Sequence, residues 1–150
     1  GLDLSPLDLP VSPGVRRAAR ETSRALEALE RHGLELVALR PPPGAARAWR
    51  HLGLPRAARR LGLDGLHAFT SGFPVLGPGW RTCTVHEVPW RHGEAENADA
   101  RHRLWVRVGS RRAARLVTPS AAVARDVADE APHAATRVRV VPWGVDAGFF

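Results

Sequence analysis

Six short apolar segments alternate with stretches of helical periodicity along the chain, and this alternation limits the possible folds more than any other feature. Strands are predicted at residues 2–5, 34–40, 65–69, 81–85, 115–118 and 138–142. Helices are predicted at residues 15–29, 55–61, 95–114 and 119–131, and the third is expected to place Leu104, Trp105 and Val108 on one face. Strands and helices that alternate in this way build a mainly parallel sheet with helices on both faces. The predicted fold class is therefore α/β, with a doubly wound, mainly parallel sheet.

Length and composition are those of one ordinary globular domain spanning residues 1–150. A chain of 150 residues can bury one core, and 44% hydrophobic with 25% charged residues excludes a disordered chain. No apolar run approaches the roughly 20 residues of a membrane-spanning helix. The one cysteine, Cys83, excludes an internal disulfide, and its place inside a predicted buried strand indicates an inert thiol. This cysteine usage fits a reducing, cytoplasmic location.

All 22 positions that hold lysine or arginine are arginine, and the net charge is +7. The arginines are spread along the chain rather than gathered in a tail, so nucleic acid is not predicted as a partner. Arginine without lysine, together with abundant alanine, indicates a coding bias more than a selected binding surface. A further use of the charge is contact with the anionic inner face of a membrane, where each arginine near the surface contributes about 1 kcal/mol.

The chain closes on Phe149 and Phe150, after a glycine-containing exit from the last predicted strand. Nothing within the chain yet covers this apolar pair. We therefore expect residues 1–150 to be a fragment that a C-terminal domain follows.

Ligands bind beyond the carboxyl ends of the strands in sheets of this kind, so the segments after the strands hold the candidate site residues. The first such segment contains Gly14, Val15, Arg16 and Arg17. A glycine at a helix N-terminus lets a ligand approach free backbone N–H groups, and the helix dipole there favours phosphate. The segment is neither Gly-x-Gly-x-x-Gly nor a P-loop, so the alternative is an ordinary helix start with solvated arginines.

His86 and Glu87 follow the fourth predicted strand, where both side chains could face a crevice. An imidazole there could hydrogen-bond a substrate hydroxyl or accept a proton near neutral pH. The alternative is a buried, satisfied histidine beside a glutamate that caps a helix or carries surface charge. No spacing of His, Asp and Glu resembles a metal triad, so neither a metal nor another cofactor is predicted.

Ser120 follows the fifth strand at the start of a helix, where an N-cap is the favoured interpretation and a ligand contact the alternative. His67 stands between apolar neighbours within a strand, which favours a structural role. Trp80, Trp90 and Trp105 could stack on a ligand, although tryptophans more often belong to a core or an interface. The absence of Gly-x-Ser-x-Gly argues against a serine hydrolase.

The order of these segments resembles that of family 4 glycosyltransferases. Residues 14–21 (Gly-Val-Arg-Arg-Ala-Ala-Arg-Glu) resemble their Gly-x-Gly-Arg-x-x-Arg-Glu helix start, and residues 63–68 resemble their Asp-hydrophobic-His-Ala strand. Residues 85–87 look like their His-Asp pair, and residues 115–120 look like their hydrophobic-Thr-x-Ser strand end. Residues 141–146 are similar to their Pro-x-Gly-Val-Asp segment. This chain departs from the pattern at Arg16, which replaces the second glycine, at Ala18, which replaces a common Tyr, and at Glu87, which replaces Asp.

The resemblance implies a GT-B enzyme, in which two Rossmann-like domains face each other across a cleft and transfer a sugar without a metal, usually with retention at the anomeric carbon. The chain would be the acceptor-binding half, and the C-terminal half would bind most of the nucleotide-sugar donor. His86 would lie beside the transferred sugar, Gly14 and the N–H groups after it near the donor diphosphate or the acceptor, and Ser120 on the acceptor side. The acceptor would be a glycan, a lipid-linked oligosaccharide or a small molecule.

Two other functions are compatible with parts of the sequence. A non-catalytic, Rossmann-like binding domain could use its basic face on an anionic partner. An NAD-linked oxidoreductase is disfavoured, because Gly-x-Gly-x-x-Gly and the acidic residue expected after it are absent.

Overall fold

A six-stranded parallel sheet forms the centre of the molecule. The structure is a computed structural model that describes residues 1–29, 33–44, 48–72, 75–93 and 100–145. The strand order is β2-β1-β3-β4-β5-β6, and every neighbouring pair is parallel. The strands are β1 (Leu2–Asp3), β2 (Ala38–Leu39), β3 (Gly65–Ala68), β4 (Trp80–Thr84), β5 (Arg115–Thr118) and β6 (Val138–Val140). Each predicted strand is confirmed to within a few residues, and so is the α/β, Rossmann-like class.

The α-helices of the described residues are α1 (Pro13–Ala28), α3 (Leu54–Arg60), α4 (Ala100–Leu104) and α5 (Ala121–Glu130). Short turns of π- or 3-10 helix surround them, namely η1 (Ser5–Leu7), η2 (Trp49–Gly53), η3 (Pro89–Arg91), η4 (Trp105–Gly109), η5 (Ser110–Arg112) and η6 (Pro132–Arg137). The predicted helix at residues 95–114 is thus a composite of α4, η4 and η5, and its first residues lie outside the described ones.

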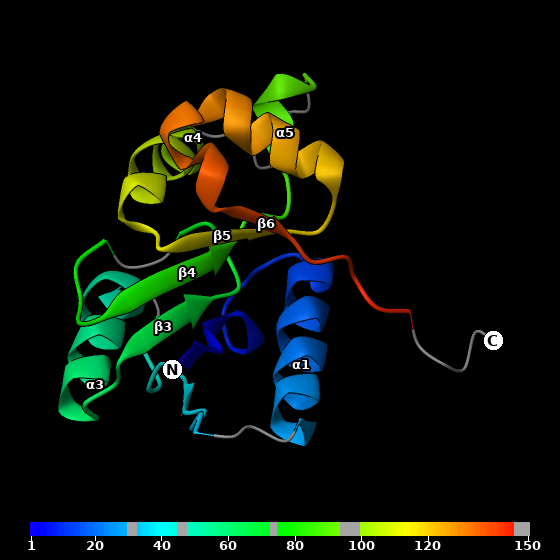
Figure 1. Cartoon of the computed structure of the whole chain (residues 1–150). Helices are drawn as coiled ribbons and strands as arrows, with labels where there is room; N and C mark the ends of the chain where they lie inside the picture. Colours follow the sequence, from blue (N-terminus) through cyan, green and yellow to red (C-terminus); the bar gives the residue numbers. More distant parts are fainter. Residues whose placement is uncertain (30–32, 45–47, 73–74, 94–99, 146–150) are drawn as a thin grey trace.

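The helices cover both faces of the sheet, as the alternation of side chains along the strands shows. Phe69, just after β3, belongs to a cluster with Ala19 of α1, whereas Leu66 of β3 belongs to a cluster with Leu54 of α3. Because residues three apart on a strand point to opposite faces, α1 and α3 lie on opposite sides of the sheet. Figure 1 shows α1 on one side of β3 and β4 and α3 on the other. On the side of α3, Val127 of α5 completes a further cluster around β4 and β5.

The apolar face predicted for the third helix is partly wrong. Leu104 is 59% exposed and Val108 is 45% exposed, whereas Val106 is 3% exposed and packs against the core. Val106 lies inside the π-helical η4, where each turn holds more residues than in an α-helix. The wider turn shifts the buried positions away from those that an α-helical period assigns.

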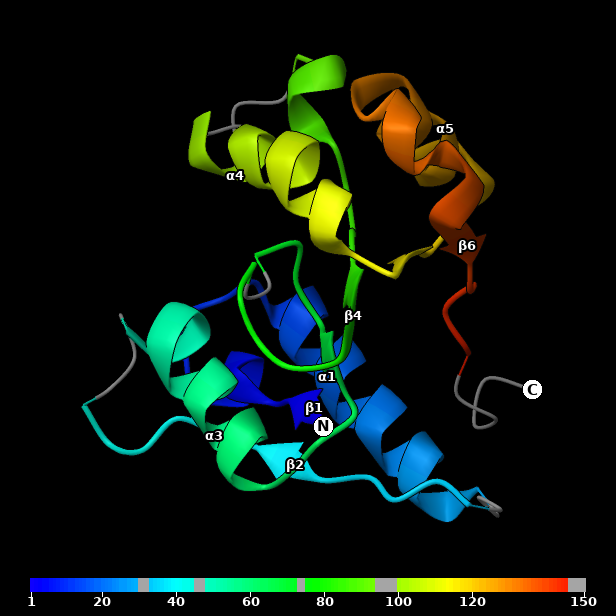
Figure 2. The same ribbon diagram turned by 60° about the vertical axis from the view of Figure 1, so that its left-hand side comes forward.

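The chain leaves β1 and β3 in opposite directions across the sheet. The segment after β1 leads to β2 at one edge, and the segment after β3 leads to β4 toward the other. Figure 2 shows β1 between α3 and α1. A doubly wound sheet opens a crevice at such a reversal, at the carboxyl ends of the strands. A site is therefore expected between the carboxyl ends of β1 and β3.

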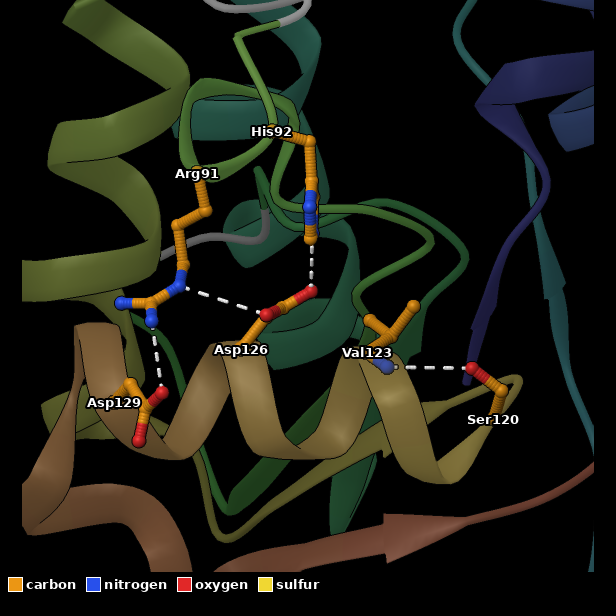
Figure 3. Close-up of polar contacts among 6 residues, drawn as sticks. All are labelled: Arg91, His92, Ser120, Val123, Asp126 and Asp129. Carbon is orange, nitrogen blue, oxygen red and sulfur yellow. Dashed lines mark hydrogen bonds and ion pairs between the residues drawn. The ribbon is translucent and has the colours of Figure 1, made fainter.

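Ion pairs fix α5 to the turn after β4 and to α4. Arg91 contacts Asp126 at 3.5 Å and Asp129 at 2.8 Å, and His92 Nε2 donates to Asp126 Oδ2 at 2.8 Å (Figure 3). Further along the helix, Glu130 Oε1 accepts a hydrogen bond from Arg103 at 3.1 Å and another from Arg107. These pairs connect α5 to the elements that carry one wall of the site.

We expect Glu130→Gln to lower the free energy of unfolding at pH 7 by about 1–2 kcal/mol. This value lies in the lower part of the range for hydrogen bonds between charged groups, because Arg103 and Arg107 are half exposed. Burial alone would raise the pKa of Glu130, but the guanidinium groups of Arg103 and Arg107 lower it. A carboxylate with a lowered pKa stabilises the fold above its unfolded pKa, and this stability is lost as pH falls through the folded pKa.

Urea unfolding at a series of pH values measures this effect. The loss of stability between about pH 5 and pH 3 should be smaller in Glu130→Gln than in the parent chain. Asp64→Asn serves as the control, because Asp64 is exposed and makes no side-chain ion pair within the described residues. Parallel pH profiles for the parent and Glu130→Gln would contradict the assignment.

Candidate functional site

A cavity of about 380 Å³ opens between the carboxyl ends of β1 and β3, where the chain reversal places it. Its walls come from the loop after β1 with the start of α1, from η2, from the loops after β3 and β4, and from α4 with η4. The lining residues are Pro10, Val11, Ser12, Val15, Arg50, Thr70, Ser71, Gly72, His86, Glu87, Arg101, His102 and Trp105. Its volume lies within the range of small-molecule sites, about 300–1,000 Å³.

The structure brings part of the predicted site together. Val15, His86 and Glu87 line the cavity. Gly14, Arg16 and Arg17 lie beside Val15 in the first turn of α1, and Ser120 lies after β5; these four are not among the lining residues.

The N-terminus of α1 has a side-chain cap, and its backbone at Gly14 is exposed. Ser12 Oγ accepts a hydrogen bond from the Val15 N–H at 3.4 Å, a cap that the sequence analysis did not assign. Gly14 is exposed, and an added Cβ would meet no atom within 4 Å. Packing within the domain therefore does not require glycine there, and its backbone is open to approach from outside. The Arg16 guanidinium donates a hydrogen bond to the Leu9 carbonyl at 3.2 Å and so connects α1 to the loop before it. Arg17 is exposed.

Ser120 caps α5, as predicted. Its Oγ accepts a hydrogen bond from the Val123 N–H at 3.2 Å (Figure 3). The helix begins directly after it at Ala121. The cap explains the serine by itself, and the ligand contact remains a prediction.

His86 is held in one tautomer at the end of β4. Its Nε2 lies 2.8 Å from the Phe69 carbonyl oxygen, and because a carbonyl can only accept, Nε2 carries the proton. Burial lowers the pKa of His86, and His102 lowers it further, against the opposing effects of the Phe69 hydrogen bond and the Glu87 charge. The imidazole is therefore neutral at pH 7, and its Nδ1 is a hydrogen-bond acceptor. Trp143, which follows β6, stacks on the ring with centroids 5.3 Å apart and planes at 19°.

His67 and Cys83 have the structural roles that the sequence predicts. His67 Nδ1 lies 2.8 Å from Thr82 Oγ1, and burial lowers the pKa of His67 to about 4. The Cys83 side chain is buried in β4, and burial raises the pKa of its thiol to about 12. Neither group is available for chemistry at neutral pH.

Arg50, Arg101 and Trp105 line the cavity and were missed as site residues. Arg50 lies on η2 and passes so close to Gly72 that an added Cβ would be 2.9 Å from its Nη1. Trp105 stacks on His51, with centroids 5.2 Å apart and planes at 8°. Trp105 was a candidate for stacking on a ligand, but neither arginine has a sequence signal, because neither directly follows a strand.

Neither a metal-binding cluster nor a membrane-spanning helix occurs in the part of the chain that the structure describes. No group of three His, Cys, Asp or Glu side chains among these residues could hold a metal ion. No helix among them is long and apolar enough to cross a bilayer.

Comparison with known proteins identifies the family. The model of Glycosyltransferase Family 4 matches residues 11–149, which include every lining residue of the cavity except Pro10. Comparisons with curated proteins and with solved structures gave no significant match. The match spans most of the chain and every strand except β1, and it agrees with the parallel sheet. The chain therefore belongs to glycosyltransferase family 4.

Proposed function

We propose that this chain is the acceptor-binding domain of a retaining glycosyltransferase that uses a nucleotide-sugar donor. In the reaction, the bond between the anomeric carbon and the diphosphate oxygen breaks, a bond to an acceptor hydroxyl oxygen forms, and the hydroxyl proton is released. The observation that carries the proposal is the cavity at the chain reversal, which has His86 in its wall in a chain of this family. A donor-binding domain outside residues 1–150 is part of the proposal, so turnover requires a protein that includes it.

His86 supplies a hydrogen-bond acceptor in this proposal. Its Nε2–H is committed to the Phe69 carbonyl, and Nδ1 has no hydrogen-bond partner among the residues described. A neutral imidazole accepts through Nδ1, so it would bind a hydroxyl of the transferred sugar. Glu87 beside it would bind further hydroxyl groups.

The open N-terminus of α1 is suited to the leaving diphosphate. Negative charge develops on this group as the bond to the sugar breaks, and a helix N-terminus stabilises an anion through its free N–H groups and its dipole. Gly14 leaves room for the approach, and Arg17 is the exposed cation of the same turn. No metal or other cofactor takes part in the proposed reaction.

The Gly14→Ala variant tests this role. Because the new methyl group meets no atom of the domain, the variant should gain about 0.5 kcal/mol in free energy of unfolding from the better helix former. In the protein with its donor-binding domain, the same methyl group should hinder the diphosphate and lower kcat/KM by about tenfold. Thermal unfolding and steady-state kinetics measure the two effects.

Arg20→Ala is the matched control, because Arg20 is exposed on the same helix. It should leave kcat/KM unchanged. A stabilised Gly14→Ala enzyme with parental kinetics would contradict the proposed diphosphate contact. Failure of the parent protein, donor-binding domain included, to release nucleoside diphosphate from any nucleotide sugar would contradict the proposed function itself.

A further inference from the structure

Arg50 and Arg101 are two cationic side chains in the wall of the cavity. Arg91, Arg103 and Arg107 each have a carboxylate within ion-pair distance. Neither Arg50 nor Arg101 forms such a pair within the described residues, although both line the cavity. Two cations of one cavity thus have no carboxylate within ion-pair distance among the described residues.

The surroundings of Arg50 make the lack of a close counter-ion among the described residues energetically unfavourable. Arg50 is partly buried, and its Nε is a buried donor without a hydrogen-bond acceptor among the described residues. Burial lowers the pKa of Arg50, the charge of Asp3 raises it, and Arg101 lowers it again. Asp3 is the nearby acid, but its Oδ1 already accepts hydrogen bonds from the Ser5 N–H at 3.1 Å and from Trp49 Nε1 at 3.2 Å. A half-buried cation with an unpartnered buried N–H and a second cation in the same cavity favours the binding of an anion.

The arginines and His86 come from different walls of the cavity. Arg50 lies on η2 and Arg101 on α4, whereas His86 and Glu87 follow β4. Two walls of the cavity thus carry a cation suited to an anion, and a third carries the hydrogen-bond acceptor His86 Nδ1, suited to a hydroxyl group. Trp105, held by its stack on His51, adds an aromatic side chain to the wall.

We infer that the acceptor is a phosphorylated sugar or polyol, whose phosphate monoester lies between Arg50 and Arg101 while its hydroxyl groups face His86 and Glu87. This inference rests on the proposed function. A phosphate monoester carries a charge of about −1.5 to −2 at pH 7, which matches two guanidinium groups better than a carboxylate does. Its oxygens can accept hydrogen bonds from both arginines. The phosphate could belong to a soluble sugar phosphate or to a lipid headgroup.

Binding to the 150-residue chain tests the inference without turnover. Titration calorimetry would compare glucose 6-phosphate with glucose, which lacks the anion. Glucose 6-phosphate should bind at least about tenfold more tightly, and Arg50→Gln and Arg101→Gln should each remove at least about tenfold of its affinity. Arg56→Gln, on the exposed side of α3, is the matched control and should bind like the parent. Because Arg101 is exposed, Arg101→Gln keeps the test valid even if Arg50→Gln fails to fold.

Vesicles distinguish the two sources of phosphate. Phosphatidylcholine vesicles with and without phosphatidic acid present the monoester as a lipid headgroup. Binding that needs phosphatidic acid and is lost in Arg101→Gln but kept in Arg56→Gln would support the inference with a lipid acceptor. If the vesicles do not bind but glucose 6-phosphate binds through both arginines, the result would support the inference with a soluble acceptor.

Three outcomes would overturn the inference. If Arg56→Gln weakens glucose 6-phosphate binding as much as Arg50→Gln and Arg101→Gln do, the effect is one of general surface charge. If Arg50→Gln weakens UDP binding as much as it weakens glucose 6-phosphate binding, the two arginines belong to the donor site. Transfer to neutral acceptors that is unaffected by Arg50→Gln and Arg101→Gln would overturn the inference but leave the proposed function intact. Conversely, specific phosphate binding by a protein that transfers no sugar would reject the proposed function while the anion site remains.

Discussion

Replacing His86 by alanine is expected to lower the turnover of the enzyme with its donor-binding domain by about 10²-fold, while the free energy of unfolding falls by only about 1 kcal/mol. The small loss of stability reflects one hydrogen bond, from Nε2 to the Phe69 carbonyl. The large loss of turnover reflects the acceptor atom Nδ1, whose hydrogen bond to the transferred sugar would strengthen as charge develops in the transition state. Steady-state kinetics and urea unfolding of the same variant separate the two.

Two isosteric variants separate the two nitrogens of His86. The amide nitrogen of glutamine can take the place of Nε2–H, and the amide oxygen of asparagine can take the place of Nδ1. His86→Gln should therefore keep most of the stability and lose turnover, whereas His86→Asn should lose stability and keep more of the turnover. Equal losses of turnover in the two variants would show that the ring matters through packing on Trp143 rather than through Nδ1.

The Gly79→Ala variant is expected to lose at least about 3 kcal/mol of unfolding free energy, a large fraction of the stability of a domain. Gly79 has a φ of +62°, and an added Cβ would lie 1.7 Å from the Asp64 carbonyl oxygen. That oxygen accepts a hydrogen bond from the Trp80 N–H at 3.1 Å, at the start of the β3–β4 pair. Any movement that relieves the clash disturbs this pairing. Urea unfolding measures the loss.

Gly62 offers a close control because its φ is also +62° and an added Cβ would meet nothing within 4 Å. Gly62→Ala should therefore cost only the strain of a left-handed alanine, about 1–2 kcal/mol. The difference between the two variants isolates the clash with Asp64. If both lose the same amount, the loop at Gly79 relaxes freely and the tight approach is not a constraint on the fold.

The strands and the general place of the site could be predicted from the sequence because both depend on local patterns. Short apolar runs such as residues 115–118 occur between helical stretches, and a parallel sheet follows from their order. The same reasoning places ligands after the strands, which located His86 and Glu87 correctly in the cavity wall. Ser120 was recognised as a cap because Ser at the start of a helix is a local signal.

The rest of the cavity depends on contacts between distant parts of the chain. Arg50 lies on η2 and Arg101 on α4, so only the folded chain brings them to one cavity. The π-helical turn at η4 was not predicted either, because an α-helical period assigns the buried face to positions other than Val106. The proposed donor contacts of Gly14 and Arg17, the metal-free reaction and the cytoplasmic location remain predictions.

The stack of Trp143 on His86 gives the site a natural fluorophore. Trp143 is 46% exposed and lies on the segment that leaves the sheet after β6, so its indole faces both solvent and the site histidine. Indole emission responds to the polarity around the ring and is quenched by a protonated imidazole. Entry of a ligand beside His86, or a change in the path of the departing segment, therefore changes an intrinsic optical signal, and neither event needs an attached label to be followed in time.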